Sequence, residues 1–255
     1  LLRILKDHSK ELGVIATQDE LEASAQRTEE QLANSTASVA VNNARVNGGR
    51  FEFNVSVTNK AGHKFPTAYP ARRAWLHVTV RDARGAVVFE SGAVRPDGSV
   101  AGNDNDEDAL KFEPHYTRIT SPDQVQIYES IMGDFAGRVT TGLLSATHYL
   151  KDNRLLPRGF DKNTAPERIA VGAPAKADPD FVGGSDTVAY SVALPAGASG
   201  PYTTNVEMLF QSIGFRWAQN LRNYDAPEPK RFVGYYTQAA AQSSKLIARA
   251  AATAN

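Results

Sequence analysis

His63 has the surroundings in which a histidine could bind a metal ion held by another part of a protein. It lies in the segment 59–77, with a second histidine, two adjacent arginines and one of the two tryptophans of the chain. Pro66 and Pro70 restrict the backbone and Gly62 permits a tight bend, so the sequence predicts an ordered turn. A neutral imidazole there could ligate an iron supplied from outside the domain. Alternatively, His63 could donate to a backbone carbonyl and hold the turn.

The acidic segment 102–108 could bind a calcium ion. It begins with glycine and places the carboxylates of Asp104, Asp106 and Asp108 at alternating positions. Ca²⁺ takes several hard oxygen ligands from flexible loops of this kind. The EF-hand spacing is not met, because no glycine and no bidentate glutamate stand at the required offsets. The alternative is a solvated acidic loop that binds no ion.

Glu113 and His115 stand two residues apart and could serve acid–base catalysis. No nucleophile or oxyanion hole is marked nearby. The chain also lacks the phosphate-binding glycine loops, the Gly-x-Ser-x-Gly elbow and the His-Glu-x-x-His pair. The sequence therefore gives little support to an enzyme, and we predict no catalytic residue in this segment.

The composition excludes several classes of function. The chain has 255 residues, with 28 basic and 28 acidic side chains, so no positive excess exists to bind nucleic acid. No apolar run approaches the length of about 18 residues that a transmembrane helix requires. There is no cysteine, which removes disulfides, thiolate nucleophiles and covalent haem attachment within this stretch.

The secondary structure that must position these residues begins with a helical region at the N-terminus. Residues 1–34 form a predicted helical hairpin, in which Gly13 ends the first helix and 17–20 carries the Ser/Thr-x-x-Glu pattern of a capping box. The chain enters this helix without an initiator Met or a signal peptide. We therefore expect 1–34 to continue from a missing N-terminal region.

Residues 35–213 are predicted to form a mainly β domain. Phe51, Phe53, Val55 and Val57 alternate with polar residues, which is typical of a half-buried strand. Further short strands follow without intervening helices, so we predict an antiparallel β-sandwich of immunoglobulin-like type. Residues 214–255 are predicted to be C-terminal helices that pack on the sandwich or its partner, with a final helix running past Ile247 into an alanine-rich tail that frays.

Several blocks of the sequence resemble the C-terminal region of bacterial multihaem c-type cytochromes. The blocks are GHKFPTAYPARRAWLHVTVRDARGAVVFESG, GNDNDEDALKFEPHYTRI, VQIYESIMGD, YLKDNRLLPRGFDK and FQSIGFRWAQNL. In those proteins a segment with several Cys-x-x-Cys-His sites precedes a haem-free, β-rich domain. The N-terminal LLRILKDHSKELGV is similar to the helix that follows the last haem segment. This chain departs from the family in having no Cys-x-x-Cys-His site.

The resemblance implies a function that no single motif indicates. It implies an accessory domain of an exported cytochrome, located in the periplasm or at the cell surface. Such a domain would dock onto the haem-bearing region of the same protein or a cytochrome partner, and haem c would belong to the parent protein. It also favours His63, and more weakly His115, as a haem ligand or haem neighbour. The alternatives are an exported β-sandwich module that binds a protein or glycan, with structural Ca²⁺, and then a hydrolase using Glu113 and His115.

Overall fold

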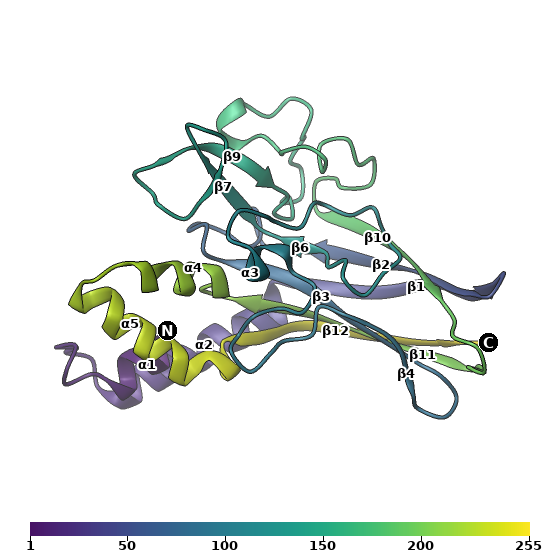
Figure 1. The fold of residues 1–255 in the computed structure, drawn as a ribbon, viewed down its shortest axis with the longest axis horizontal. Helices are drawn as coiled ribbons and strands as arrows, with labels where there is room; N and C mark the ends of the chain where they lie inside the picture. Colours follow the sequence, from purple (N-terminus) through teal and green to yellow (C-terminus); the bar gives the residue numbers. More distant parts are fainter.

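The computed structural model describes residues 1–255, and two β-sheets packed face to face form its centre (Figure 1). The first sheet has four strands in the order β1 (Ala37–Asn47), β2 (Arg50–Asn59), β10 (Ser185–Ala193) and β5 (Arg118–Ile119). The second has five: β12 (Ser244–Ala254), β11 (Tyr202–Gln211), β3 (Arg73–Arg81) and β4 (Val87–Ser91), with β6 (Ile127–Tyr128) also paired to β3. All pairs are antiparallel except the short one between β10 and β5. The prediction of a mainly β, antiparallel sandwich is confirmed.

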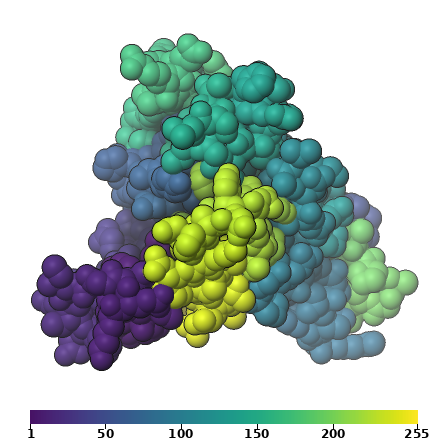
Figure 2. Space-filling view, turned by 60° about the vertical axis from the view of Figure 1, so that its left-hand side comes forward, coloured from purple at the N-terminus to yellow at the C-terminus, as the bar shows by residue number.

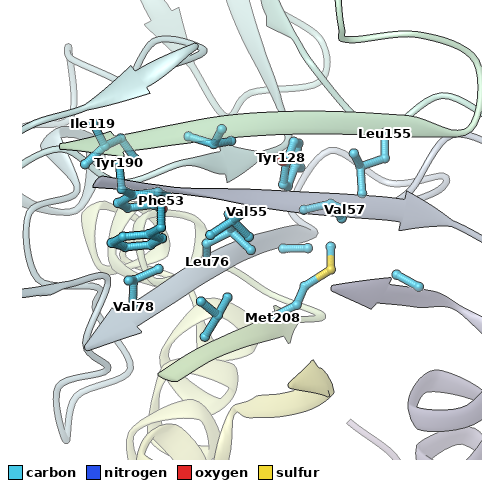
Figure 3. Close-up of a cluster of buried hydrophobic side chains, with 14 of the residues drawn as sticks. Phe53, Val55, Val57, Leu76, Val78, Ile119, Tyr128, Leu155, Tyr190 and Met208 are labelled. Carbon is cyan, nitrogen blue, oxygen red and sulfur yellow. The ribbon is translucent and has the colours of Figure 1, made fainter. Parts of the chain in front are cut away.

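The core lies between the two sheets and follows directly from the period-two pattern. Every second side chain of β2, beginning with Phe51, is buried, while the residues between them are partly exposed. Figure 3 shows labelled side chains from both sheets filling the space between them, Val55 and Tyr190 from the first and Leu76 and Met208 from the second. Burial of this apolar surface is the main force that holds the sheets together.

A smaller three-stranded sheet lies above the sandwich (Figure 1). It consists of β7 (Ser130–Asp134), flanked by β8 (Val139–Thr140) and β9 (Ala146–Asp152). The Pro- and Gly-rich stretch after β9 is irregular, as predicted, apart from one turn of 3-10 helix at Glu167–Ile169. Its side chains Val171 and Phe181 are nevertheless buried in the main core. The loops of this stretch therefore contribute side chains to the same core as the two sheets.

The helices gather at one end of the molecule, and the C-terminus lies at the other (Figure 1). α1 (Leu2–Asp7) is shorter than predicted: it is capped at His8 rather than ending at Gly13, which has a positive φ but lies in the turns that follow. α2 (Gln18–Ser35) begins with the predicted capping box, in which Thr17 and Glu20 bond each other reciprocally. No helix of the structure is long and apolar enough to cross a membrane.

The C-terminal region differs from the prediction. α4 (Phe215–Asn220), a 3-10 turn (Leu221–Asn223) and α5 (Pro227–Ala239) are helical as expected, and a further 3-10 turn (Ala240–Gln242) follows. Residues 244–254, however, form β12, which pairs with β11 along its whole length. The predicted helix through Ile247 and the fraying tail are wrong, and the sandwich extends beyond residue 213.

The reason for this difference is tertiary. Alanine has the highest intrinsic helix propensity, so the sequence alone favours a helix at 248–254. In the fold, β12 supplies hydrogen bonds that the edge of β11 would otherwise lack, and Ile247 is buried in the main core. Pairing and burial outweigh a preference worth only tenths of a kcal/mol per residue, about 0–0.7 for ordinary residues.

Candidate functional site

The turn that carries His63 is held through its main chain by Asn59, the last residue of β2. The Asn59 amide nitrogen lies 2.9 Å from the carbonyl oxygen of His63, and 3.1 Å from those of both Leu155 and Leu156. Its amide oxygen accepts a hydrogen bond from the Ala61 N–H at 2.9 Å. The backbone of the turn is therefore fixed to the segment after β9, and the His63 side chain is exposed to solvent.

A buried carboxylate supports the next residue of the turn. The ammonium group of Lys64 lies 2.8 Å from Asp152, which also binds the Arg154 guanidinium at 2.8 Å. Burial alone would raise the pKa of Asp152, but Arg154 and Lys64 lower it below its ordinary value. Burial lowers the pKa of Lys64, and Asp152 partly opposes this effect. Asp152 is thus ionised and holds both cations beneath the turn.

His115 lies in the interior and both of its ring nitrogens are engaged. Its side chain has no exposed surface, and Nε2 lies 2.9 Å from a carboxylate oxygen of Asp178. Nδ1 faces two side-chain amide nitrogens, that of Gln126 at 3.0 Å and that of Asn153 at 3.2 Å. Burial lowers the pKa of His115, while Asp178 opposes the shift. The imidazole is therefore neutral at pH 7.

The orientation of the two amides determines which nitrogen of His115 carries the hydrogen. The Gln126 amide oxygen accepts from the Tyr116 N–H at 2.8 Å, and the Asn153 amide oxygen accepts from the Glu129 N–H at 3.0 Å. Both amides consequently present N–H groups to His115, so Nδ1 accepts and Nε2–H donates to the carboxylate. No lone pair remains free for an iron, and this geometry does not support His115 as a haem ligand.

Asp186 completes this buried polar network. One ligand atom from each of His115, Asp178 and Asp186 lies within 4.8 Å of the others, which is a possible metal-binding arrangement. Asp186 accepts hydrogen bonds from the Tyr128 hydroxyl at 2.7 Å and from the Gln126 amide at 3.2 Å. Burial raises the pKa of Asp186 to about 7. Because His115 Nε2 carries a hydrogen, we interpret the cluster as a hydrogen-bonded network rather than a metal centre.

The sequence contained a signal for part of this network. Asp186 stands two residues before Val188 in a strand whose alternate side chains are buried, so the period-two pattern already places its carboxylate on the inner face. Asp178 lies in the irregular stretch, where no periodicity indicates burial. Gln126 and Asn153 flank short strands and carry no distinctive motif.

The acidic segment does not form the predicted arrangement of ligands. Asp106 lies in a short helix, α3 (Asp104–Glu107), and both of its carboxylate oxygens bind the Arg73 guanidinium, at 2.7 and 2.9 Å. Asp104 is exposed and Asp108 is half-buried. Since the one fully buried carboxylate is already neutralised by an arginine, the geometry gives no support to a Ca²⁺ site made by these three residues.

Glu113 and His115 also have separate partners. Glu113 is buried and accepts hydrogen bonds from the main-chain nitrogens of Asp104 and Val125, both at 3.3 Å. Burial raises the pKa of Glu113. His115 is occupied by the network described above, so the two groups do not form an acid–base pair open to a substrate.

A groove of about 440 Å³ separates the N-terminal helices from α5 and the adjoining end of β11. The two helical regions lie next to each other on one face of the molecule, purple and yellow in Figure 2. The walls of the groove are mainly apolar, and the charged residues that line it are Arg3, Glu29, Arg72 and Lys245. Nothing in the sequence marked this groove, since its residues come from five separate segments.

No protein-family model and no curated protein matches the chain. Among solved structures, it is similar to the crystal structure of a penta-heme cytochrome c552 from Thermochromatium tepidum, with 15% sequence identity and a TM-score of 0.50. The match covers 88% of this chain and 41% of that one, so this chain spans less than half the length of the cytochrome. At this identity the likeness shows a shared fold alone. The chain itself has no cysteine and so no covalent haem c attachment site.

Proposed function

We propose that this chain is a haem-free supporting domain of an exported multihaem cytochrome c. The observation that carries the proposal is the fold shared over 88% of the chain with part of a penta-heme cytochrome. Because the chain lacks cysteine, the haems of such a protein belong to another region, onto which this domain docks. Its contribution to electron transfer is to shield a haem edge and to tune its potential, which depends on burial and axial ligation.

His63 is the residue that serves a haem in this proposal. Its imidazole is exposed and forms no hydrogen bond or ion pair within the chain, while Asn59 fixes the main chain on which it stands. A nitrogen lone pair on a rigid turn can approach an iron with little loss of conformational entropy. His63 is therefore proposed as an axial ligand or a direct haem neighbour.

The same proposal places the protein in the periplasm or at the cell surface, because haem c is attached there. The partner is the haem-bearing region of the same product or a separate cytochrome. The balanced charge of the chain, 28 basic against 28 acidic residues, supports docking to a protein rather than to nucleic acid.

The absorbance spectrum of the natively purified, full-length gene product tests this function. We expect a Soret band together with the α and β bands of a c-type cytochrome. A colourless product, from a gene that encodes no Cys-x-x-Cys-His site, would overturn the proposal.

The role of His63 has its own test in that protein. His63→Ala should shift the haem spectrum or the reduction potential, since an imidazole ligand or neighbour is lost. His148→Ala is the matched control, because His148 is also exposed but bonds to Thr147 on β9. Identical spectra and potentials in wild type and His63→Ala would show that His63 is a turn residue with no role at a haem.

A further inference from the structure

The groove between the N-terminal helices and α5 has the lining of a small-molecule site. Its volume, about 440 Å³, falls within the range of about 300–1,000 Å³ that is usual for ligand pockets. The apolar side chains that line it are mainly aliphatic, and they come from both sides of the groove: Leu2, Ile4, Leu32, Phe210, Ile213 and Phe232. An occupant must therefore carry an apolar body.

The charged groups of the groove are not balanced. Three cationic side chains line it against one carboxylate, although the whole chain has no net charge. Glu29 is shared by Arg3 and by Lys245, the latter at 2.8 Å, and these contacts lower the pKa of Glu29 to about 2. The Glu29 carboxylate thus already binds two cations, and Arg3 is also paired with Glu22 at 3.1 Å. Arg72 is therefore the cation left for a further anion.

Arg72 is the cation that remains without an acidic partner. Its guanidinium donates one hydrogen bond, to the main-chain oxygen of Thr67 at 3.1 Å, and it forms no ion pair in the structure. A guanidinium has five N–H donors in a planar arrangement that matches a carboxylate. Arg72 can therefore bind an acidic head group while an attached chain lies along the apolar walls.

We propose that this groove binds an aliphatic carboxylate of the fatty-acid class, with its head group on Arg72. The mostly aliphatic walls suit a flexible chain, which can follow the space between helices. A rigid, flat dicarboxylate such as a porphyrin would need a slot with parallel walls. The inference is independent of the proposed haem-supporting function, because His63 does not line the groove and binding there needs no haem.

Calorimetric titration of the natively purified, full-length gene product with decanoate tests the proposal. Decanoate should bind, more weakly as salt rises, and decanol should bind less well because it lacks the charge. Arg72→Gln should weaken decanoate binding about fivefold, the value of one partly exposed charge pair. Arg84→Gln, in the exposed β3–β4 turn, is the matched control and should bind as wild type does.

A second variant tests the space in the groove separately from the charge of Arg72. Thr28 lines the groove from α2 and is exposed, so Thr28→Trp should fill the space without disturbing the core. Decanoate binding should then be lost while the melting temperature is unchanged. The proposal is overturned if wild type fails to bind decanoate, if Arg72→Gln or Thr28→Trp binds it unchanged, or if mesoporphyrin binds and decanoate does not.

Discussion

His63 and His115 lie in opposite surroundings within one fold. At His63 the hydrogen bonds of the turn are made by the main chain and by Asn59, and the imidazole is left in solvent. At His115 the imidazole itself makes the hydrogen bonds, to Asp178 on one side and to the amides of Gln126 and Asn153 on the other. The His63 ring is therefore open to a partner, whereas the His115 ring is part of the hydrogen bonding that holds the fold together.

This contrast explains why the residue type alone does not identify a ligand. A metal-binding histidine needs one free nitrogen lone pair, and its second nitrogen is commonly held by a hydrogen bond. His115 satisfies the second condition and fails the first, because its only lone pair accepts from two amides. His63 satisfies the first condition, and its position is fixed by backbone contacts instead of by a bond to the ring.

The largest expected effect separates the two histidines by stability. His115→Ala should lower the free energy of unfolding by about 4–5 kcal/mol, because it leaves a cavity and removes one hydrogen-bond partner from each of two buried amides and a buried carboxylate. His63→Ala should change it by less than about 0.5 kcal/mol, as is usual for exposed positions. Urea denaturation followed by tryptophan fluorescence measures both. Similar losses in the two variants would mean that the His63 ring also supports the fold.

The next effect concerns the acidic segment, where Asp106, predicted as a calcium ligand, is paired with Arg73 instead. Asp106→Asn should destabilise the protein by about 3–4 kcal/mol, because Arg73 is then buried without its counter-ion. The loss should be the same in EGTA and in millimolar Ca²⁺. Asp104→Asn, at an exposed position of the same helix, is the control and should have little effect. Calcium-dependent stability that disappears in either variant would restore the metal site.

A pH-dependent effect distinguishes the acid of the buried network from exposed acids. The unfolded chain loses the Asp186 proton near pH 4, while the folded protein keeps it until about pH 7. Between these values the folded state binds more protons, so this group makes stability fall with rising pH, by about 4 kcal/mol in all. Asp186→Asn should remove that fall in urea titrations from pH 4 to 8.

Two neighbours of Asp186 contribute to the pH dependence that remains in that variant. The pKa of Asp180 is raised by burial and by Asp178, so it contributes a fall in the same direction. The lowered pKa of His115 contributes a rise with pH below about 6.5. Asp225→Asn, at an exposed site, should leave the profile of the wild type unchanged. An unchanged profile in Asp186→Asn would show that its carboxylate is solvated.

The parts of the fold that the sequence predicts are those with a regular local pattern. The alternation of Phe51, Phe53 and Val55 predicts a strand because nothing opposes it, and the Thr17–Glu20 capping box begins α2 as expected. The prediction fails at β12, where alanine propensity and tertiary pairing point to different structures. Local patterns are reliable only where long-range contacts agree with them.

The site was harder to predict for a related reason. Side chains separated by more than sixty residues, such as His115 and Asp178, meet only after the irregular stretch folds over the sandwich. A sequence shows that His115 could bind a metal or a proton. It does not show that the amides of Gln126 and Asn153 already donate hydrogen bonds to its Nδ1 lone pair. Exposure of His63 likewise depends on how Asn59 holds the turn.

The smallest expected effect is a difference in chemical access, and it tests the contrast without altering the fold. Diethylpyrocarbonate acylates a ring nitrogen that has a free lone pair and contact with solvent. In the native protein, peptide mapping by mass spectrometry should therefore find His63 modified and His115 unmodified, since His115 has neither property. In urea both should react, because unfolding releases the Nδ1 lone pair from the amides. Native modification of His115 at a rate near that of His63 would show that the network opens readily, and that its imidazole is also available as a ligand.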